Sequence, residues 1–506
     1  MLLSHFIINS SDAVIENIDP QAILNEIIIY VFIAINYKTG GKLTGQTTAE
    51  QPVRLRTEIL GGLTTFLSMA YILALYPNIM SKIGLPPGGA MIAAALSAAL
   101  GTFLMGLLAN YPFALAPGVG VIPFFAFSVV ISMKISWQFA MMAVFVEGLI
   151  FILLSLTKVR EILFDIIPRP LKIAISVGIG LFIIFIALQG AKIIVGGPCL
   201  TALVPFRKDF NISGICAVLT IIGTAITVKL YHSKVPGALL WGILITWGLG
   251  MLCQLAGIYH VNPQAGMFSL YPSFSFSSCG QAFKEFGSLF GQCLSVDKWV
   301  SQESSLHGLN LLFSINFLVV IFTLLFDDLF NTIGTLAGIA SASGMLDKDG
   351  RLPRVRYALL ADAVATSAGS LLGATTTTTY VESATGILAG GKTRLTSYAT
   401  AAMFLLSVIF APIFSTIPAF AIAPALLIVG YCMVSQINQI NFNDLPESLP
   451  CLIAIVMMPF PYNIADGIFF GFISWTVINL LCGRKDRVNA FLITLSILFV
   501  LKYIFL

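Results

Sequence analysis

The sequence predicts an all-α polytopic membrane protein, and three observations carry this fold class. Only 10% of the 506 residues are charged and 58% are hydrophobic, whereas a soluble domain carries roughly 25% charged residues. Apolar runs of about 20 residues, the length that a bilayer-spanning helix needs, recur along the chain. The alternating segments of about ten residues that mark a membrane β-barrel are absent.

The hydrophobic pattern divides the chain into fourteen expected spans. They lie near 57–80, 87–108, 112–132, 136–157, 170–190, 211–230, 235–257, 311–340, 356–373, 375–390, 395–415, 418–435, 450–463 and 464–482. Residues 1–53 precede them as an atypical extension. The apolar tail 488–506 is either a further span or a packed terminal helix.

Charge supports this count and gives an orientation. With the start of the first span in the cytoplasm, most Lys and Arg residues fall in cytoplasmic loops, as the positive-inside rule requires. The basic loops therefore fix orientation in a lipid bilayer rather than bind nucleic acid. We expect a multi-pass protein of the inner (plasma) membrane with both termini in the cytoplasm.

Two of the expected spans cannot be ordinary helices. The third contains Pro112, Pro117 and Pro123 within a short stretch, and proline breaks a helix interior. The tenth contains a threonine run, 375–379, whose β-branched side chains favour an extended backbone. Irregular backbone at membrane depth is tolerated only where protein or a water-filled cavity satisfies its polar groups.

The broken spans lie seven spans apart, which suggests an internal repeat. A repeat of seven spans forces the second copy to be inverted across the membrane. Paired broken segments in inverted halves are typical of the binding site of a secondary transporter. We therefore expect two inverted seven-helix repeats with the broken third and tenth spans at their centre.

Acidic residues inside the spans are the strongest chemical signal, because a carboxylate is costly in lipid. In the eighth span, Asp327 and Asp328 are followed by Asn331, and either acid shares a helical face with that amide. This pattern favours a polar ligand site over a structural hydrogen-bond cluster. Two adjacent acids repel, so one can hold a proton, and we therefore assign Asp328, Asp327 and also Glu382 to proton coupling.

Glu382 follows the threonine run inside the broken tenth span. A half-helix that starts there presents backbone N–H groups beside the carboxylate. The carboxylate could accept N–H donors from a heterocycle, or it could only cap the helix. Thr378 and Thr379 either donate to a ligand or satisfy the backbone, and Tyr380 joins them in the candidate site.

The remaining intramembrane acids receive structural roles. We expect Glu147 to be a structural partner, Asp362 to complement a helix dipole near the start of the ninth span, and Asp466 to cap a helix. Asp444 and Glu447 belong to a cytoplasmic link and are expected to be solvated.

Neither catalysis nor a cofactor is indicated. No zinc-protease, phosphate-loop or serine-hydrolase motif occurs, so we predict neither an enzyme, nor a metal site, nor a bound cofactor. Among the phenylalanines after the broken third span, Phe124 is the candidate for stacking on a flat ligand.

Several long motifs in order resemble one family, the adenine/guanine/hypoxanthine permease branch of the nucleobase–ascorbate transporter family. The resemblance runs from about Arg56 to Arg487. It rests on Arg56-Thr-Glu-Ile-Leu-Gly-Gly-Leu-Thr-Thr-Phe-Leu-Ser-Met-Ala-Tyr-Ile-Leu, Ala109-Asn-Tyr-Pro-Phe-Ala-Leu-Ala-Pro-Gly, Phe326-Asp-Asp-Leu-Phe-Asn-Thr-Ile-Gly-Thr-Leu, Gly373-Ala-Thr-Thr-Thr-Thr-Thr-Tyr-Val-Glu-Ser-Ala-Thr-Gly and Ile455-Val-Met-Met-Pro-Phe-Pro-Tyr-Asn-Ile-Ala-Asp-Gly-Ile.

This resemblance implies import of purine nucleobases (hypoxanthine, guanine, adenine) by proton symport, driven by the proton gradient and with an elevator-type motion. Within a transporter unit at 54–487, it implies a core domain, about 57–157 and 311–415, that carries substrate against a gate domain, about 170–257 and 418–482. Many members are homodimers. Carried over by position, the two site acids are Asp328 and Glu382.

The sequence departs from the family pattern twice. Ile122 stands where the family commonly has a polar binding residue, and Asn331 stands where it has a second aspartate. Both changes remove polarity where substrate is expected. Two alternatives therefore stay open: the same fold carrying uracil, xanthine or another small solute, and a degenerate paralogue that does not transport.

Overall fold

The computed structural model describes residues 55–156, 168–196, 201–203, 210–261, 269–272, 276–301, 308–342, 345, 352–461 and 464–505. All of them belong to the unit Arg54–Leu506. The extension 1–53 lies outside the described residues. At some helical positions the side chain also lies outside the description, and Asp327 and Asn331 are among these.

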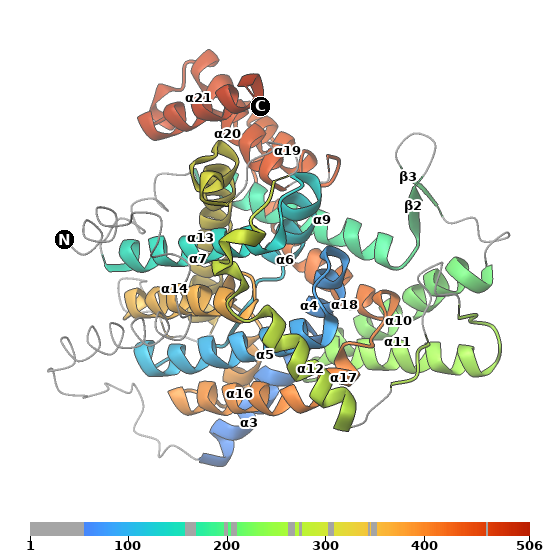
Figure 1. Cartoon of the computed structure of the whole chain (residues 1–506). Helices are drawn as coiled ribbons and strands as arrows, with labels where there is room; N and C mark the ends of the chain where they lie inside the picture. The colour runs from blue at the N-terminus through green and yellow to red at the C-terminus, as the bar shows by residue number, and fades with distance from the viewer. Residues whose placement is uncertain are drawn as a thin grey trace, which may run out of the picture. The chain divides into compact units, whose positions relative to one another are not determined.

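The first seven expected spans correspond to apolar helices and one broken segment (Figure 1). In chain order they are α3 (Leu55–Met69) with α4 (Ile72–Met80), α5 (Pro87–Leu104), β1 (Leu115–Pro117) with α6 (Val121–Pro123) and η4 (Phe124–Ser132), α7 (Trp137–Leu156), α9 (Arg169–Gly190), α10 (Ile215–His232) and α11 (Ala238–Leu255).

The last seven follow the same scheme. They are α13 (Ile315–Ala342), α14 (Val355–Leu372), β4 (Thr377–Thr379) with α15 (Ser383–Leu388), α16 (Arg394–Ser407) with α17 (Ala411–Phe414), α18 (Ala419–Val434), α19 (Leu445–Val456) and α20 (Ile464–Leu481). The predicted all-α membrane fold is confirmed.

Shorter elements connect these segments. They are η2 (Ser81–Ile83), η3 (Met105–Ala109), a hairpin of β2 (Ile194–Gly196) and β3 (Thr201–Leu203), η5 (Phe210–Gly214), α12 (Phe276–Leu289), η7 (Gln292–Leu294), η8 (Val296–Lys298), η9 (Gly308–Phe313), η10 (Val408–Phe410), η11 (Ser435–Gln439), η12 (Lys485–Arg487) and α21 (Ala490–Phe505).

The helices have the composition and exposure that lipid contact requires. In the described part of the chain, eight helices are long and apolar enough to cross a bilayer. Large apolar side chains such as Leu153, Leu252 and Leu318 point outward and are more than half exposed. Because lipid solvates such side chains as well as a protein core does, their exposure needs no further partner in a membrane.

The two broken spans meet as a pair of antiparallel strands. β1 pairs with β4 in the register Leu115 with Thr379, Ala116 with Thr378 and Pro117 with Thr377. Two equivalent segments of inverted halves must run in opposite directions where they cross, which is the pairing that these strands show. The predictions that the third span is not a continuous helix and that the threonine run of the tenth is extended are therefore confirmed.

The helices pack in two groups. Helices α3, α5, α7, α14, α15 and α16 contact one another, and α5, α7, α14 and α16 run side by side in Figure 1. Helices α9, α10, α11, α18, α19 and α20 form a second set of contacts, with the largest between α9 and α18. We call these the α5 group and the α9 group. The crossing strands contact α5 and α14 of the α5 group.

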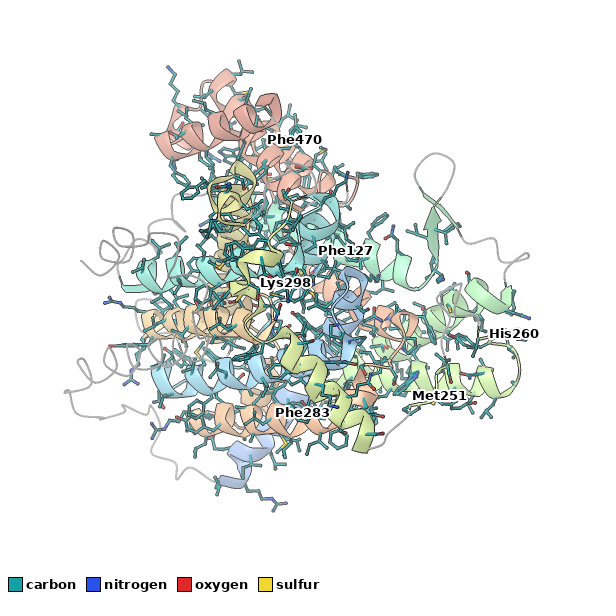
Figure 2. All side chains as sticks on the ribbon, in the orientation of Figure 1. Phe127, Met251, His260, Phe283, Lys298 and Phe470 are labelled. Atoms are coloured by element: carbon teal, nitrogen blue, oxygen red, sulfur yellow. The ribbon has the colours of Figure 1, made fainter. Side chains whose placement is uncertain are left out.

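Two helices lie outside the fourteen spans: α21, whose role the sequence left open, and α12, which the sequence did not predict. The tail forms α21, which packs against α20, and Ser496 donates to Thr476 at 2.9 Å. The tail is thus a packed helix. The amphipathic helix α12 was not expected; it buries Ala282 and Leu289 and leaves Phe283 53% exposed (Figure 2).

Candidate functional site

The antiparallel strands bring the starts of two half-helices to one place. The N–H of Gly118 donates to the Thr376 carbonyl at 2.9 Å, and the N–H of Tyr380 donates to the Ala114 carbonyl at 3.0 Å. Just beyond the strands, α6 begins and continues into η4, while α15 begins at Ser383. The N–H groups of Ser383, Ala384 and Thr385 at the start of α15 donate to the carbonyls of Tyr380, Val381 and Glu382, so the polar atoms that the crossing can offer to a ligand are those of side chains.

Glu382 occupies the position immediately before α15, as predicted. Its side chain makes no capping hydrogen bond to its own helix. Instead, the Tyr71 hydroxyl donates to Glu382 Oε1 at 3.0 Å. Tyr71 and Tyr380 are 1% and 4% exposed, while Glu382 is partly exposed. Glu382 is therefore the most exposed of these three residues at this end of the crossing.

The threonine run divides into anchored and unanchored side chains. Thr376 donates to Glu147 Oε2 at 2.7 Å, and the Thr377 hydroxyl lies 3.2 Å from that of Thr366. In contrast, the buried hydroxyls of Thr375 and Thr379 have no hydrogen-bond partner within the described residues. The hydroxyls of Thr376 and Thr377 thus bond to side chains of neighbouring helices, and whether the hydroxyl of Thr379 donates to a ligand stays a prediction.

The eighth span contributes a second hydrogen-bonded group. Asp328 is 0% exposed, and the Thr332 hydroxyl donates to its Oδ1 at 3.0 Å. The same hydroxyl lies 3.1 Å from Oδ2 of Asp362 on α14. Two buried carboxyl groups therefore lie within hydrogen-bond distance of the same threonine hydroxyl. The side chains of Asp327 and Asn331, which the sequence also assigned to this site, lie outside the described part of the structure.

Asp362 differs from its expected role. It is the eighth residue of α14, which begins at Val355, so it stands two turns inside the helix rather than in the first turn. A helix dipole acts mainly on charges in the terminal turn, so that interpretation was wrong. Thr332 and Asp362 are functional candidates that sequence reasoning missed, because a threonine in an apolar helix gives no distinctive signal.

The first-half side of the crossing is apolar. Ile122 and Phe124 are 0% and 1% exposed at the start of the half-helix formed by α6 and η4. Further along η4, the Lys82 ammonium lies 5.2 Å from the centre of the Phe127 ring (Figure 2). The first polar side chain of this half-helix is Ser128, which is 0% exposed and whose hydroxyl has no hydrogen-bond partner among the described residues.

Two expectations outside the crossing can be compared with the geometry. Asp444 and Glu447 are not simply solvated, since Arg484 and Arg487 form ion pairs with them. Asp466 lies in the first turn of α20, as expected. Among the described residues, no three His, Cys, Asp or Glu side chains are grouped to hold a metal ion.

Several known permeases are similar in sequence to this chain over most of its length. The guanine/hypoxanthine permease PbuG of Bacillus subtilis is 39% identical over 462 residues, covering 89% of this chain and 97% of that protein. The adenine permease AdeP of Escherichia coli is 34% identical over 457 residues, covering 90% and 94%. A putative permease of Methanocaldococcus jannaschii is 38% identical over 452 residues, covering 89% and 95%.

Solved structures share the fold at low identity. The transmembrane domain of the cyanobacterial bicarbonate transporter BicA matches with a TM-score of 0.57 at 16% identity, covering 82% of this chain and 97% of that domain. The anion transporter Slc26a9 of mouse matches with a TM-score of 0.56 at 10% identity, covering 95% and 75%. These likenesses show the fold alone.

The family model agrees with both comparisons. It is the model of the xanthine/uracil permease family, described as the permease family, and it matches residues 56–468. That range contains both broken spans and both hydrogen-bonded groups of acids. This multi-pass membrane protein therefore belongs to the permease family.

Proposed function

We propose that this permease is a secondary active transporter that imports purine nucleobases, namely hypoxanthine, guanine and adenine. The observation that carries the proposal is the position of the partly exposed residue Glu382, which makes no capping hydrogen bond to its own helix, at the crossing of the two broken spans. A carboxylate has only acceptor sites, which match the ring N–H and amino donors of a purine. The names of the relatives, guanine/hypoxanthine and adenine permeases, support this substrate class.

The groups around Glu382 complete a site for a flat, polar ring. The buried hydroxyl of Thr379, at the end of β4 before Glu382, has no hydrogen-bond partner among the described residues and would donate to a ring nitrogen or carbonyl of the ligand. The other broken span contributes the buried apolar side chains of Ile122 and Phe124. Such a site, with few polar groups in apolar surroundings, is the usual form of a small-molecule pocket.

Proton coupling is the second part of the proposal, and Asp328 supports it. A hydroxyl has one proton, so Thr332 can donate to Asp328 or Asp362 but not to both at once. Both contacts are hydrogen bonds only when one carboxyl group carries a proton. The two acids and Thr332 thus form a site that can bind one proton within the membrane. Helix α13, which carries Asp328 and Thr332, also contacts β4 at the crossing.

The two packing groups support an elevator-type motion. The α5 group contacts the crossing strands and carries Glu382 at the start of α15, while the α9 group packs mainly on itself. Movement of the α5 group against the α9 group would carry the crossing, and any bound purine, from one membrane face to the other.

Uptake by cells that lack their own purine carriers tests the proposal. We expect accumulation of radiolabelled hypoxanthine, guanine or adenine that collapses when a protonophore is added. Glu382→Gln should abolish this uptake while leaving the amount of protein in the membrane unchanged. Asp466→Asn, which removes an acid from the first turn of α20, is the matched control and should retain uptake.

The same assay separates the alternatives. Uptake of uracil or xanthine in place of these purines would correct the substrate class and keep the transport mechanism. Absence of uptake and binding for every nucleobase, with folded protein in the membrane, would favour a non-transporting paralogue, for which the apolar Ile122 is the motivating observation. An anion carrier is disfavoured because two carboxyl groups, Glu382 and Asp328, stand at the site.

A further inference from the structure

The first span bends at the level of the site and places a tyrosine there. Helix α3 ends at Met69 and α4 begins at Ile72, so that Ala70 and Tyr71 form the junction. Tyr71 is 1% exposed, and its hydroxyl donates to Glu382 Oε1 at 3.0 Å across 311 positions of sequence. A residue outside both broken spans therefore contacts the carboxylate of the proposed purine site.

The half-helix that follows Glu382 depends on α3 for its position. Helix α15 has six residues, and helices shorter than about 12 residues are marginal on their own. A methyl group added at Gly386 would overlap the Gly61 carbonyl oxygen and the Thr65 hydroxyl, so the two backbones are in direct contact. Midway along this contact, Thr385 donates to the Ser68 hydroxyl at 3.1 Å.

A carboxylate on α3 holds the far end of the same segment. Glu58 is 4% exposed and accepts the backbone N–H groups of Lys392 and Thr393 at 3.2 and 3.1 Å. Polar contacts thus run along the first span from Glu58, through Ser68, to Tyr71. Glu58 holds the backbone that follows α15, while Ser68 and Tyr71 contact the side chains of Thr385 and Glu382.

The Tyr71 hydroxyl has a definite chemical effect at this point. A hydrogen bond to an ionised acceptor is about twice as strong as a neutral one and fixes the geometry of the acceptor. The bond to Oε1 selects one orientation of the Glu382 side chain and leaves Oε2 free of this bond, available to accept from a ligand. Preorganisation of this kind raises affinity because less side-chain freedom is lost on binding.

We propose that Tyr71 is a positioning residue that sets purine affinity by fixing the orientation of Glu382. This inference rests on the proposed function, in which Glu382 binds the purine. It adds the first span to the elements that determine affinity, although the hydroxyl of Tyr71 itself is committed to the carboxylate.

Tyr76 provides a matched control on the same bent span. It is 0% exposed, its hydroxyl donates to the Gly373 carbonyl at 2.9 Å, and it accepts the N–H of Thr375 at 3.2 Å. Tyr76→Phe therefore removes a buried hydroxyl that bonds to the backbone of the tenth span but not to Glu382. A merely structural role of Tyr71 predicts similar effects of both substitutions on affinity.

The test measures equilibrium binding of radiolabelled hypoxanthine to purified full-length protein, together with KM and maximal uptake rate in cells. Tyr71→Phe should raise Kd and KM by about three- to tenfold, the cost of ordering one additional side chain on binding. Its maximal rate and membrane level should stay close to those of the parent protein. Tyr76→Phe should leave Kd within about twofold of the parent, because it makes no bond to Glu382.

Each outcome decides between the two proposals. Parent protein that binds no purine would overturn the proposed function and this inference with it. Binding that Glu382→Gln destroys but Tyr71→Phe leaves unchanged, or weakens no more than Tyr76→Phe does, would overturn only the inference. If Tyr71→Phe does not fold, a ring-fluorinated tyrosine at this position, a stronger donor of nearly the same shape, should lower Kd; an unchanged Kd would overturn the inference.

Discussion

The broken spans of the two halves share a backbone arrangement but differ in chemistry. Each has a three-residue strand followed by a half-helix, and the strands pair with one another. The first-half side of the crossing presents buried apolar side chains, Ile122 and Phe124. The second-half side presents the hydroxyl of Thr379 and the carboxylate of Glu382.

This difference shows that the crossing and its chemistry have separate causes. Prolines and glycines produce extended backbone in the first half, while β-branched threonines produce it in the second. The polar atoms come from the second half and from its contacts with the first span, Tyr71 above all. Substitutions in the second half should therefore affect transport more than equivalent ones in the first half.

The largest difference in uptake is expected between alanine substitutions of the glycines near the starts of the two half-helices. Gly386→Ala places a methyl group into the backbone of α3 at Gly61, whereas the methyl group of Gly118→Ala would lie 3.1 Å from side-chain atoms of Thr378 and Val121. Overpacking costs about 1–3 kcal/mol, and backbone atoms yield less readily than side chains do. We expect Gly386→Ala to lower uptake by more than tenfold and Gly118→Ala by only a few-fold.

Uptake per amount of membrane protein checks this prediction. Gly248→Ala on α11, where an added methyl group meets no atom within 4 Å, is the control and should behave like the parent. Equal losses in Gly386→Ala and Gly118→Ala would show that the two halves contribute alike and would break the comparison.

A smaller effect, on the stability of the protein, is expected when neighbouring threonines of the second half are replaced. Thr376→Val removes the hydroxyl that donates to buried Glu147, which costs about 1–3 kcal/mol of stability because a buried acceptor loses its donor. Thr375→Val removes a buried hydroxyl that has no hydrogen-bond partner in the described structure, so it should be neutral or slightly stabilising. Thermal unfolding of the purified proteins measures both.

A lower melting temperature for Thr376→Val and an equal or higher one for Thr375→Val would confirm that the run combines anchored and unanchored hydroxyls. A lower melting temperature for both variants, by similar amounts, would mean that the threonines act only through backbone propensity. Uptake should follow stability in Thr376→Val, because the bond to Glu147 joins the threonine run to α7 and is not one of the groups proposed to bind the purine.

The features that the sequence predicted correctly depend on residues close together in the chain, whereas contacts between distant residues were missed. The interruption of both spans follows from local residue types: the prolines of the third span predicted a broken helix, and the threonine run of the tenth predicted extended backbone. The acids Glu382 and Asp328 were found because charge inside an apolar run is conspicuous. All of these signals lie within a few residues of the feature that they predict.

The partners of those acids could not be predicted in the same way. Tyr71 lies 311 positions from Glu382, and Thr332 meets Asp362 only because α13 and α14 are folded together. Neither a tyrosine nor a threonine is unusual in a membrane helix, so no composition signal marks them. The dipole interpretation of Asp362 failed because the helix starts at Val355, a full two turns before it.

The smallest predicted effect lies away from the crossing, at the link between α18 and α19. Arg484 donates to the Asp444 side chain and holds the pKa of that carboxyl below its ordinary value. Because the pKa is lowered in the folded state, the pair stabilises the protein above the unfolded-state pKa of about 4 and loses this effect as pH falls through the folded-state pKa. An exposed pair of this kind contributes little.

Asp444→Asn should therefore lower the melting temperature slightly at pH 7 and by less as the pH approaches about 4. Asp297→Asn, which changes an exposed acid in η8, is the control and should leave the melting temperature at pH 7 close to that of the parent. The purine KM should stay unchanged in both variants, because Asp444 precedes α19 of the α9 group and does not contact the crossing. A raised KM in Asp444→Asn would mean that the α9 group, and not only the polar second-half strand and the first span, determines affinity.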